Sequence, residues 1–406
     1  MHISPRIQTL APDMRAWRHM IHSKPEIAFR EHGTAEFVAT LLRSFGVEVH
    51  TGIGQTGVVG IIRGRLGDGP TIALRADMDA LPMNEQGRPV YRSVFEGVFH
   101  GCGHDGHVSI LLGTARYLAA NPLFRGKAVL IFQPAEEIVR GSQAMLDDGL
   151  LERFPFDEIY SLHNDPMLPP HKIGVRAGAQ QASSDFFTIR VKGVGTHAGM
   201  PHLGVDPITI GATLVSSLQT IVSRSVNPLE SVVITIARFH AGDAPNVIPH
   251  EAVLDGTVRA LSAASRKLAI ERIHDICKGL ELANRTQIDI EYSNSTPPII
   301  NSEGPVECVI SAAHEVVGKH NVIESIAPLM AGDDVANFLE ARPGCHFLLG
   351  QGGRMCHHPE YDFNDDVAPI GVAMFVAVLR SRLGVEIEDQ VATESVDEGA
   401  RETTGF

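Results

Sequence analysis

The stretch KAVLIFQPAEE, residues 127–137, decides the fold, because an apolar run passes through a proline into two acids. The run 127–133 is apolar on both faces, which is typical of a buried strand covered on both sides. In open α/β sheets, ligands bind at the carboxyl ends of the parallel strands. Acids directly after such a strand are therefore candidates for a functional site.

Similar strands alternate with helical patterns towards both ends of the chain. We expect further strands in TIALRA (71–76), DEIYSLH (157–163) and CHFLLG (345–350). Apolar residues at helical spacing occur in VSILLGTARYLAAN (108–121), GSQAMLDDGLLE (141–152) and APIGVAMFVAVLRSRLG (368–384). This alternation predicts an α/β domain in which helices cover both faces of a mostly parallel sheet.

The middle of the chain has a different order of elements. Strand, helix, strand, strand, helix and strand are expected in turn between residues 184 and 295, which is the ferredoxin-like pattern. The segment NSTPPIINSEGP (294–305) that follows is typical of a linker. We therefore predict a catalytic domain in two parts, 1–183 and 296–385, interrupted by an α+β domain, 184–295. The acidic tail, 386–406, is predicted to be disordered.

Length and composition restrict the class of protein. A chain of 406 residues is long for one hydrophobic core, so two domains are expected. The net charge of −14 and a pI near 5.8 argue against nucleic acid or an anionic membrane surface as the main partner. No stretch approaches the roughly 20 apolar residues of a membrane helix, and no secretory leader pattern is seen. Five scattered cysteines fit a reducing compartment, so we expect a cytoplasmic protein.

Polar side chains follow four of the predicted strands. They are the acids of DMD (Asp77, Asp79), the pair Glu136 and Glu137, His163, and the pair His357 and His358. The loop HGCGHDGH (100–107) adds Cys102 and His104 and enters a helix near Gly106. Because the carboxyl ends of parallel strands share one edge of a sheet, we expect these groups to gather there.

Each of these residues has a simpler interpretation when taken alone. An acid after a strand is often a helix cap, a Glu pair is often a solvated helix start, and Cys102 could be a small buried apolar residue. A structural zinc site would be expected to show further CxxC or HxxxH pairs, which are absent from the sequence. The combination favours a metal centre in which Glu136 and Glu137 point in opposite directions and divide the roles of base and ligand.

Eight motifs occur in a fixed order and carry a family resemblance. They are LRADMDALP, HGCGHDGH, FQPAEE, SLHNDP, GTHAGMPHLGVDPI, NVIP, GTVRAL and HHPEYDFND. Together they resemble the aminoacylase/carboxypeptidase family of metallopeptidases, in the branch of hippurate hydrolases, N-acyl-amino-acid amidohydrolases and auxin-conjugate hydrolases. The resemblance covers residues 10–385 and implies a zinc-peptidase-like catalytic domain.

The resemblance implies a binuclear site holding two divalent metal ions, zinc, manganese, cobalt or nickel. Glu136 would be the general base, and Asp79 would support the metals from behind. The motif HHP aligns the ligand with His357 rather than with His358. The implied metal ligands are Cys102, His104, Glu137, His163 and His357.

The resemblance also assigns roles in the inserted domain. His197 would polarise the scissile carbonyl, often in the site of a partner subunit, and Asn246 and Arg259 would hold the substrate. A homodimer or larger homo-oligomer is therefore expected. The family often has Glu-Asp-Phe where this chain has Asp333-Asp334-Val335, a difference that bears on the acyl-group specificity.

The expected activity is metal-dependent hydrolysis of an N-acyl or N-aroyl amino acid to a carboxylic acid and an amino acid. A dipeptidase or carboxypeptidase and a diaminopimelate-type deacetylase are neighbouring alternatives. Two further hypotheses are a metal-binding scaffold without catalysis and a thiol hydrolase that uses Cys102 with His104. The spacing of these two residues in a tight glycine turn argues against the thiol hydrolase.

Overall fold

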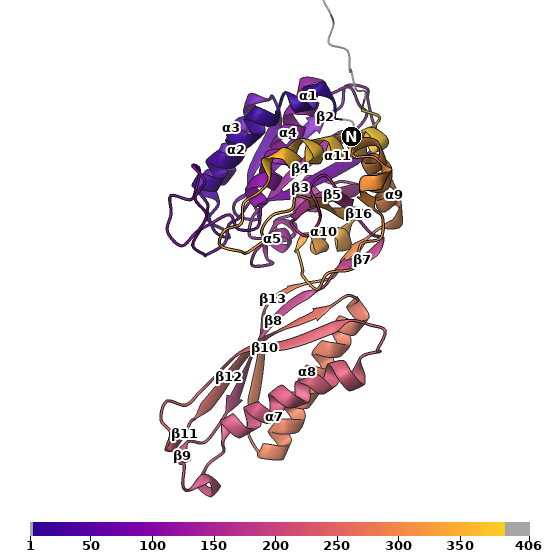
Figure 1. Cartoon of the computed structure of the whole chain (residues 1–406). Helices are drawn as coiled ribbons and strands as arrows, with labels where there is room; N and C mark the ends of the chain where they lie inside the picture. The colour runs from indigo at the N-terminus through magenta and orange to yellow at the C-terminus, as the bar shows by residue number, and fades with distance from the viewer. Residues whose placement is uncertain (1–2, 386–406) are drawn as a thin grey trace, which may run out of the picture.

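The chain forms two bodies, which a computed structural model describes over residues 3–385 (Figure 1). The larger body is built from both ends of this range, and the smaller body is built from its middle. The predicted disordered tail, 386–406, lies outside the described residues. Within residues 3–385, no helix is long and apolar enough to cross a lipid bilayer.

The larger body contains an eight-stranded sheet within the described residues, in the order β1-β2-β4-β3-β5-β16-β6-β15. Four neighbouring pairs are parallel: β3 with β4, β3 with β5, β5 with β16, and β6 with β15. The prediction of a mostly parallel sheet is therefore confirmed. The strands are β1 (Glu48–Ile53), β2 (Gly57–Arg63), β3 (Thr71–Asp77), β4 (Lys127–Gln133), β5 (Glu158–Asp165), β6 (Ile173–Gly174), β15 (Val322–Ile323) and β16 (Gly344–Gly350).

Alternate residues of the central strands pack into different layers. In β4, Leu130 belongs to the core under one set of helices, whereas its neighbours Val129 and Ile131 belong to the core under the other set. This two-sided burial explains why the strand is apolar throughout. On the first face lie α1 (Pro5–Gln8), α2 (Ala11–Ser23), α3 (His32–Ser44), α4 (His104–Ala120), α9 (Glu303–Val316) and α11 (Ala368–Leu383). On the second face lie α5 (Gly141–Asp147), α6 (Leu150–Arg153) and α10 (Val335–Ala341).

Two local predictions about the larger body were incomplete. The single helix expected over 141–152 is divided into α5 and α6, because Gly149 adopts φ 79 and begins a new turn. The antiparallel hairpin β1–β2 at the sheet edge was not predicted. Half of β1 is exposed, so its sequence lacks the apolar run that identifies the central strands.

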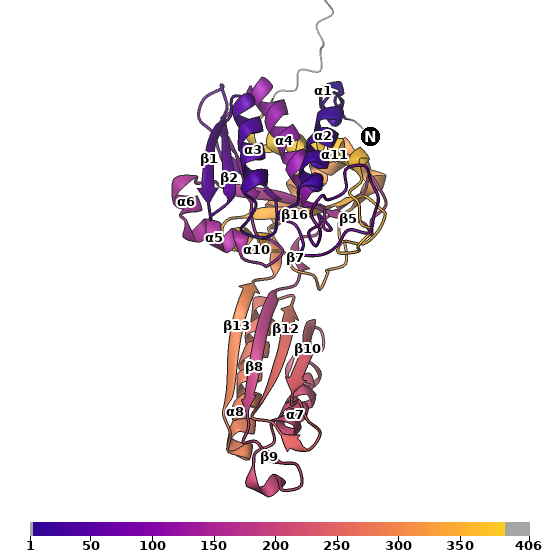
Figure 2. The same cartoon turned by 90° about the vertical axis from the view of Figure 1, so that its left-hand side faces the viewer.

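The smaller body has the β-α-β-β-α-β order predicted from the sequence. Its four strands run antiparallel in the order β10-β12-β8-β13, with a separate hydrophobic core beneath both helices (Figure 2). The elements are β8 (Ser184–Lys192), α7 (Pro207–Thr220), β10 (Val232–Ala241), β12 (Glu251–Ala260), α8 (Ala263–Asn284) and β13 (Ile288–Thr296). That residues 184–295 form an independently folding domain with these boundaries stays a prediction.

Two short pairs of strands mark the ends of the smaller body. β7 (Gly178–Gln181) and β14 (Ile299–Asn301) pair where the chain enters and leaves the larger body. β9 (Thr196–His197) and β11 (Val247–Ile248) pair at the opposite end, far from the larger body (Figure 1). Figure 2 shows β9 at this end from a second direction. This distal pair, with the loops around it, is called the tip below.

Candidate active site

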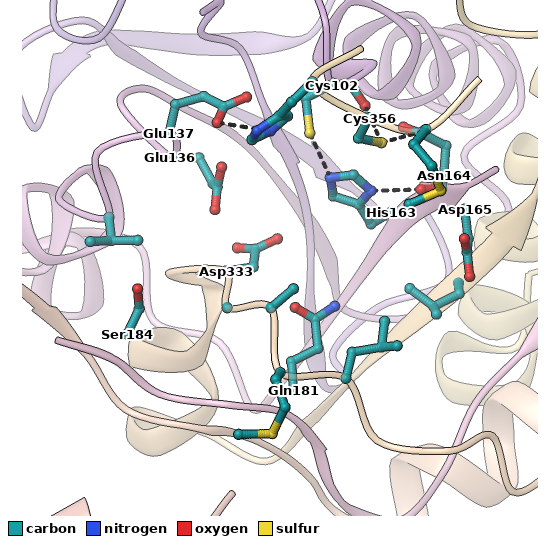
Figure 3. Close-up of a pocket in the computed structure, with 18 of the residues that line it drawn as sticks. Cys102, Glu136, Glu137, His163, Asn164, Asp165, Gln181, Ser184, Asp333 and Cys356 are labelled. Atoms are coloured by element: carbon teal, nitrogen blue, oxygen red, sulfur yellow. Dashed lines mark hydrogen bonds and ion pairs between the residues drawn. The ribbon is translucent and has the colours of Figure 1, made fainter. Parts of the chain in front are cut away.

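A pocket of about 480 Å³ lies at the carboxyl ends of the central strands, where the two bodies meet (Figure 3). This volume is within the range of sites that bind small molecules. One wall holds the thiol, imidazole and carboxylate groups Cys102, Glu136, Glu137, His163 and His357. The opposite wall holds Gln181, Ser184, Phe186 and Arg259 from the region where β7 leads into the smaller body.

Asp79 determines how the two acids after β4 are arranged. Its carboxylate oxygens accept hydrogen bonds of 3.0 Å from the backbone N–H groups of both Glu136 and Glu137. Ala135, just before them, adopts φ 53, so the segment turns. As a result both carboxylates face the pocket and lie 3.8 and 3.9 Å from His104 Nε2. The expectation that the two acids point in opposite directions was wrong, because it assumed an extended backbone.

A tight glycine turn positions Cys102 and His104. Gly103 has φ 103, and a side chain at this position would collide with the polar ends of Asn164 and Tyr361. Helix α4 begins at His104, two residues before the predicted start near Gly106. His104 Nδ1 lies 2.9 Å from the backbone oxygen of Asp79, which turns Nε2 towards the pocket acids.

Two further histidines complete the wall. His163 Nδ1 donates to the backbone oxygen of Asn164 at 2.8 Å, so Nε2 faces Cys102 Sγ at 3.4 Å (Figure 3). His357 Nε2 lies 3.4 Å from Glu137 Oε2, and the backbone of His357 has φ 66. The next residue, His358, instead accepts a hydrogen bond from the backbone N–H of Glu360. The structure therefore places His357, and not His358, beside the acids.

These side chains form overlapping groups of metal-binding atoms. Within each group the candidate ligand atoms lie within 4.8 Å of one another. His104 Nε2 and Glu137 Oε1 are buried without a hydrogen-bond partner among the described residues. A buried polar atom without a hydrogen-bond partner raises the free energy of the folded protein unless a ligand binds it. This set of nitrogen, sulfur and oxygen donors therefore fits divalent cations. Three of the groups consist of pocket-wall side chains and His104 alone: Cys102–His104–His163, Cys102–Glu137–His357 and His104–Glu136–Glu137.

Burial and neighbouring charges shift the pKa values of the groups in the pocket wall. Burial, followed by the charges of Asp333 and Glu137, raises the pKa of Glu136 well above its ordinary value. Burial and the charge of Asp79 raise the pKa of Glu137 to about 8. Burial opposes the charged form of His104, but Asp77 and Asp79 raise its pKa well above the ordinary value. A bound cation would favour the ionised acids.

A buried arginine lies behind the pocket wall. Arg75 donates to Asp77 Oδ2 at 2.6 Å and to Asp333 Oδ1 at 3.0 Å, and its side chain is fully buried. The other oxygen of Asp77 lies 2.5 Å from His107 Nδ1, and His107 Nε2 lies 2.7 Å from Asn164 Oδ1. No role for Arg75 was predicted from the sequence. The feature that could have indicated one is a charged residue inside an otherwise apolar strand.

The three substrate-side residues predicted in the inserted domain are not brought together. Arg259 lines the pocket, with its guanidinium carbon 5.5 Å from the centre of the Phe186 ring. No described carboxylate forms an ion pair with it. His197 and Asn246 lie instead at the tip, where the backbone N–H of Ala198 donates to Asn246 O at 3.0 Å. Neither residue lines the pocket of its own chain.

The fold and site define an α/β hydrolytic enzyme with a pocket suited to divalent cations. Residues 73–381 match the family described as peptidase family M20/M25/M40, and the chain belongs to this family. The family and the hydrolase class predicted from the eight motifs are therefore confirmed.

Curated relatives cover most of the chain. Hippurate hydrolase of Campylobacter jejuni subsp. jejuni serotype O:2 is 42% identical over 366 residues, covering 90% of this chain and 95% of the relative. N-acetyl-L-cysteine deacetylase of Bacillus subtilis is 36% identical over 379 residues, covering 93% of this chain and 89% of the relative.

Solved structures share this fold over most of the chain. A putative aminohydrolase from methicillin-resistant Staphylococcus aureus has a TM-score of 0.86 at 31% identity, over 93% of this chain and 98% of that chain. The YXEP protein of Bacillus subtilis, described as a dinuclear metal binding peptidase from the M20 family, has a TM-score of 0.79 at 29% identity, over 91% and 97%.

Proposed function

We propose that this enzyme hydrolyses the amide bond of N-acyl or N-aroyl amino acids, producing a carboxylic acid and an amino acid. One observation carries the proposal: a single pocket joins the cluster of candidate metal ligands to Arg259, a cation without an ion-pair partner among the described residues. Such a pocket can hold a carbonyl at one end and a free carboxylate at the other. The similarity to hippurate hydrolase supports this substrate class.

In this proposal five side chains hold two divalent metal ions, which are zinc, manganese, cobalt or nickel. The ligands are Cys102, His104, Glu137, His163 and His357. The overlap of the three ligand groups at Cys102, His104 and Glu137 supports two ions rather than one. When bound, the ions would lower the pKa of a shared water and polarise the substrate carbonyl.

Glu136 is the proposed general base. Its carboxylate is nearly buried and lines the pocket, and among the described residues it accepts no hydrogen bond. It is therefore free to take a proton from the attacking water and to deliver it to the leaving nitrogen of the amide. Asp79 holds the backbone of Glu136 and so acts as a positioning residue.

Arg259 is the proposed partner of the substrate carboxylate. Its planar guanidinium can form two parallel hydrogen bonds with a carboxylate, and Phe186 supports one face of it. Burial lowers the pKa of Arg259 because a charged group loses hydration in the pocket wall. A substrate carboxylate would compensate for that loss.

We propose further that the enzyme works as a homodimer in the cytoplasm. His197 and Asn246 are exposed at the tip, and neither lines the pocket of their own chain. Strand β9, at the tip, lies at the end of the smaller body away from the larger body (Figure 2). A partner subunit would bring its own copies of them over this pocket, where the imidazole would polarise the scissile carbonyl. The resemblance in the tip motifs supports this arrangement.

A thiol hydrolase is the competing interpretation, and one contact favours it. Cys102 Sγ lies 3.4 Å from His163 Nε2, a distance suited to a nucleophile and its base. Against this interpretation, hydrogen bonding to Cys356 and burial raise the pKa of the Cys102 thiol, which disfavours a free thiolate.

The deciding experiment measures amine release from hippurate, N-acetyl amino acids, an indole-acetyl amino acid and a dipeptide. The protein is assayed as purified, after chelation, and after addition of zinc, manganese, cobalt or nickel. We expect chelation to abolish hydrolysis of the N-acyl amino acids and a metal ion to restore it. Hydrolysis that survives verified removal of the metal would favour the thiol mechanism, and turnover of the dipeptide alone would make the enzyme a dipeptidase.

A further inference from the structure

Cys356 is a pocket residue for which the proposed mechanism has no use. It lies directly before His357 and is half-buried in the pocket wall beside Cys102 (Figure 3). Its thiol donates to the backbone oxygen of Cys102 at 3.5 Å. Two cysteines therefore lie side by side in the lining of a pocket that small molecules can reach.

Backbone and side-chain hydrogen bonds hold this thiol pair in place. The backbone N–H of His357 donates to Gly101 O at 2.7 Å, which ties the segment of Cys356 to the turn of Cys102. Asn164 Nδ2 lies 3.6 Å from Cys356 Sγ on the other side. The position of Cys356 beside Cys102 is thus held by groups on three separate segments of the chain.

The three other cysteines have different surroundings. Cys308 and Cys345 are buried in the core of the larger body, and Cys277 is buried in the core of the smaller one. None of the three lines the pocket. A small polar reagent that enters the pocket can therefore reach Cys102 and Cys356 selectively.

We propose that Cys102 and Cys356 form an oxidation site that takes a hydroperoxide and closes to a disulfide. In the first step Cys356 Sγ attacks one peroxide oxygen, the O–O bond breaks, and the second oxygen leaves as water or an alcohol. In the second step Cys102 Sγ attacks the oxidised sulfur, its S–O bond breaks, and that oxygen leaves as water. Two thiols thus lose two electrons and two protons, and one hydroperoxide is reduced.

The consequence for the enzyme rests on the proposed function, in which Cys102 is a metal ligand. A sulfur atom within a disulfide has lost the thiolate that binds a metal, so the oxidised chain would bind metal poorly. Conversely, a metal ion bound to Cys102 Sγ would engage the lone pair with which this sulfur attacks the oxidised Cys356. Oxidation and metal binding would therefore exclude each other, and a thiol reductant would restore metal binding.

The test uses the full chain in its metal-free and metal-loaded forms, treated with hydrogen peroxide. The free thiols are counted after denaturation, and linked peptides are identified by mass spectrometry. In the metal-free protein we expect the count to fall from five to three, a linked Cys102–Cys356 peptide, and recovery with dithiothreitol. In the metal-loaded protein we expect at least tenfold slower loss of thiols.

Two variants provide matched controls. Cys356→Ser should retain metal binding and form no linked peptide, whereas Cys345→Ser should still form the Cys102–Cys356 link. If metal-free wild-type protein that remains folded forms no such link, or links Cys102 to another cysteine, the proposal is wrong. This peptide readout does not depend on amide hydrolysis. A link formed by a chain that cleaves no N-acyl amino acid would contradict the proposed function alone.

Discussion

Asp79, just after β3, fixes Glu136, which follows β4, through a hydrogen bond of 3.0 Å from the Glu136 backbone N–H to Asp79 Oδ1. The second oxygen of Asp79 accepts from the next N–H in the same way. An acid after one strand therefore orients the acids that follow its parallel neighbour. This relationship makes the acids a preorganised unit rather than two independent side chains.

Asp79→Asn tests this relationship. The amide can accept one of the two backbone hydrogen bonds but presents an N–H to the other, so the turn at Glu136 should shift. We expect kcat for hippurate to fall by about 10–100-fold with little change in KM, as for other residues that support metal ligands. The exposed Asp68→Asn is the control and should leave kcat unchanged. Equal losses in both variants would contradict the positioning role.

Glu136→Gln separates catalysis from metal binding. Because a neutral amide cannot take the proton from water, we expect kcat to fall by about 10²–10⁴-fold while the metal content stays that of the wild type. Glu137→Gln should instead lower the metal content, since this side chain is a proposed ligand. Metal analysis together with steady-state kinetics checks both outcomes. A Glu136→Gln enzyme with wild-type turnover would overturn the assignment of the base.

Arg259→Met tests recognition of the substrate carboxylate. We expect kcat/KM for N-benzoylglycine to fall by about 10–100-fold, since a hydrogen-bonded charge pair contributes about 1.5–3 kcal/mol. N-benzoylglycinamide, which lacks the carboxylate, should show a much smaller difference between variant and wild type. Arg190→Met, on the neighbouring strand β8, is the matched control. A similar loss for acid and amide would remove the carboxylate role.

Mixing two inactive variants tests whether His197 serves the partner's pocket. One variant is Glu136→Gln and the other is His197→Ala, and each alone should have low activity. In a random mixture half of the dimers carry one copy of each variant, and one of the two pockets in such a dimer is intact. We therefore expect activity to rise to about a quarter of the wild-type value after subunit exchange. No recovery, in dimers shown to have exchanged, would place His197 outside the partner's site.

The metal-free protein should lose stability as the pH rises from about 6.5 to 8. Glu137 has its pKa raised to about 8, so the folded state keeps a proton that the unfolded state has already lost. Burial opposes the charged form of His22, but Asp105 and Glu85 raise its pKa to about 9, so the folded state also keeps this proton while the unfolded state loses it, and the stabilisation decreases over the same range. Differential scanning fluorimetry should show a falling Tm.

Metal loading and substitution separate the two groups in this pH dependence. A bound metal ion would replace the proton on Glu137, so the loaded protein should show a shallower fall in Tm. Glu137→Gln should flatten the metal-free profile, whereas His22→Gln should flatten the profile with or without metal. A Tm that rises between pH 6.5 and 8 in the metal-free wild type would contradict the sign of both shifts.

Much of the fold was predictable because its central strands are buried on both faces. β4 has the bounds predicted from its apolar run, Lys127–Gln133, and the strand that carries His163 was also expected. The order of elements in the inserted domain followed from the change of hydrophobic period between strands and helices. The edge hairpin β1–β2 was missed because an exposed strand carries a weak version of that signal.

Parts of the site could not be predicted, because they depend on contacts between distant segments. The direction of Glu136 follows from the φ of Ala135 and from Asp79, which lies far away in sequence. The role of Arg75 depends on Asp333, more than two hundred residues further along the chain. Neither contact leaves a periodic pattern in the sequence.

The sequence by itself determined which chemical groups follow which strands, since hydrophobic period and residue type are local properties. It thereby determined the family, the α/β class and the thiol, imidazole and carboxylate set. Only the tertiary structure decided which atoms meet. It turned both acids into one pocket, placed His357 rather than His358 beside Glu137, and left His197 at the tip. The physical reason is that backbone turns and long-range hydrogen bonds, rather than local propensity, set the final direction of a side chain.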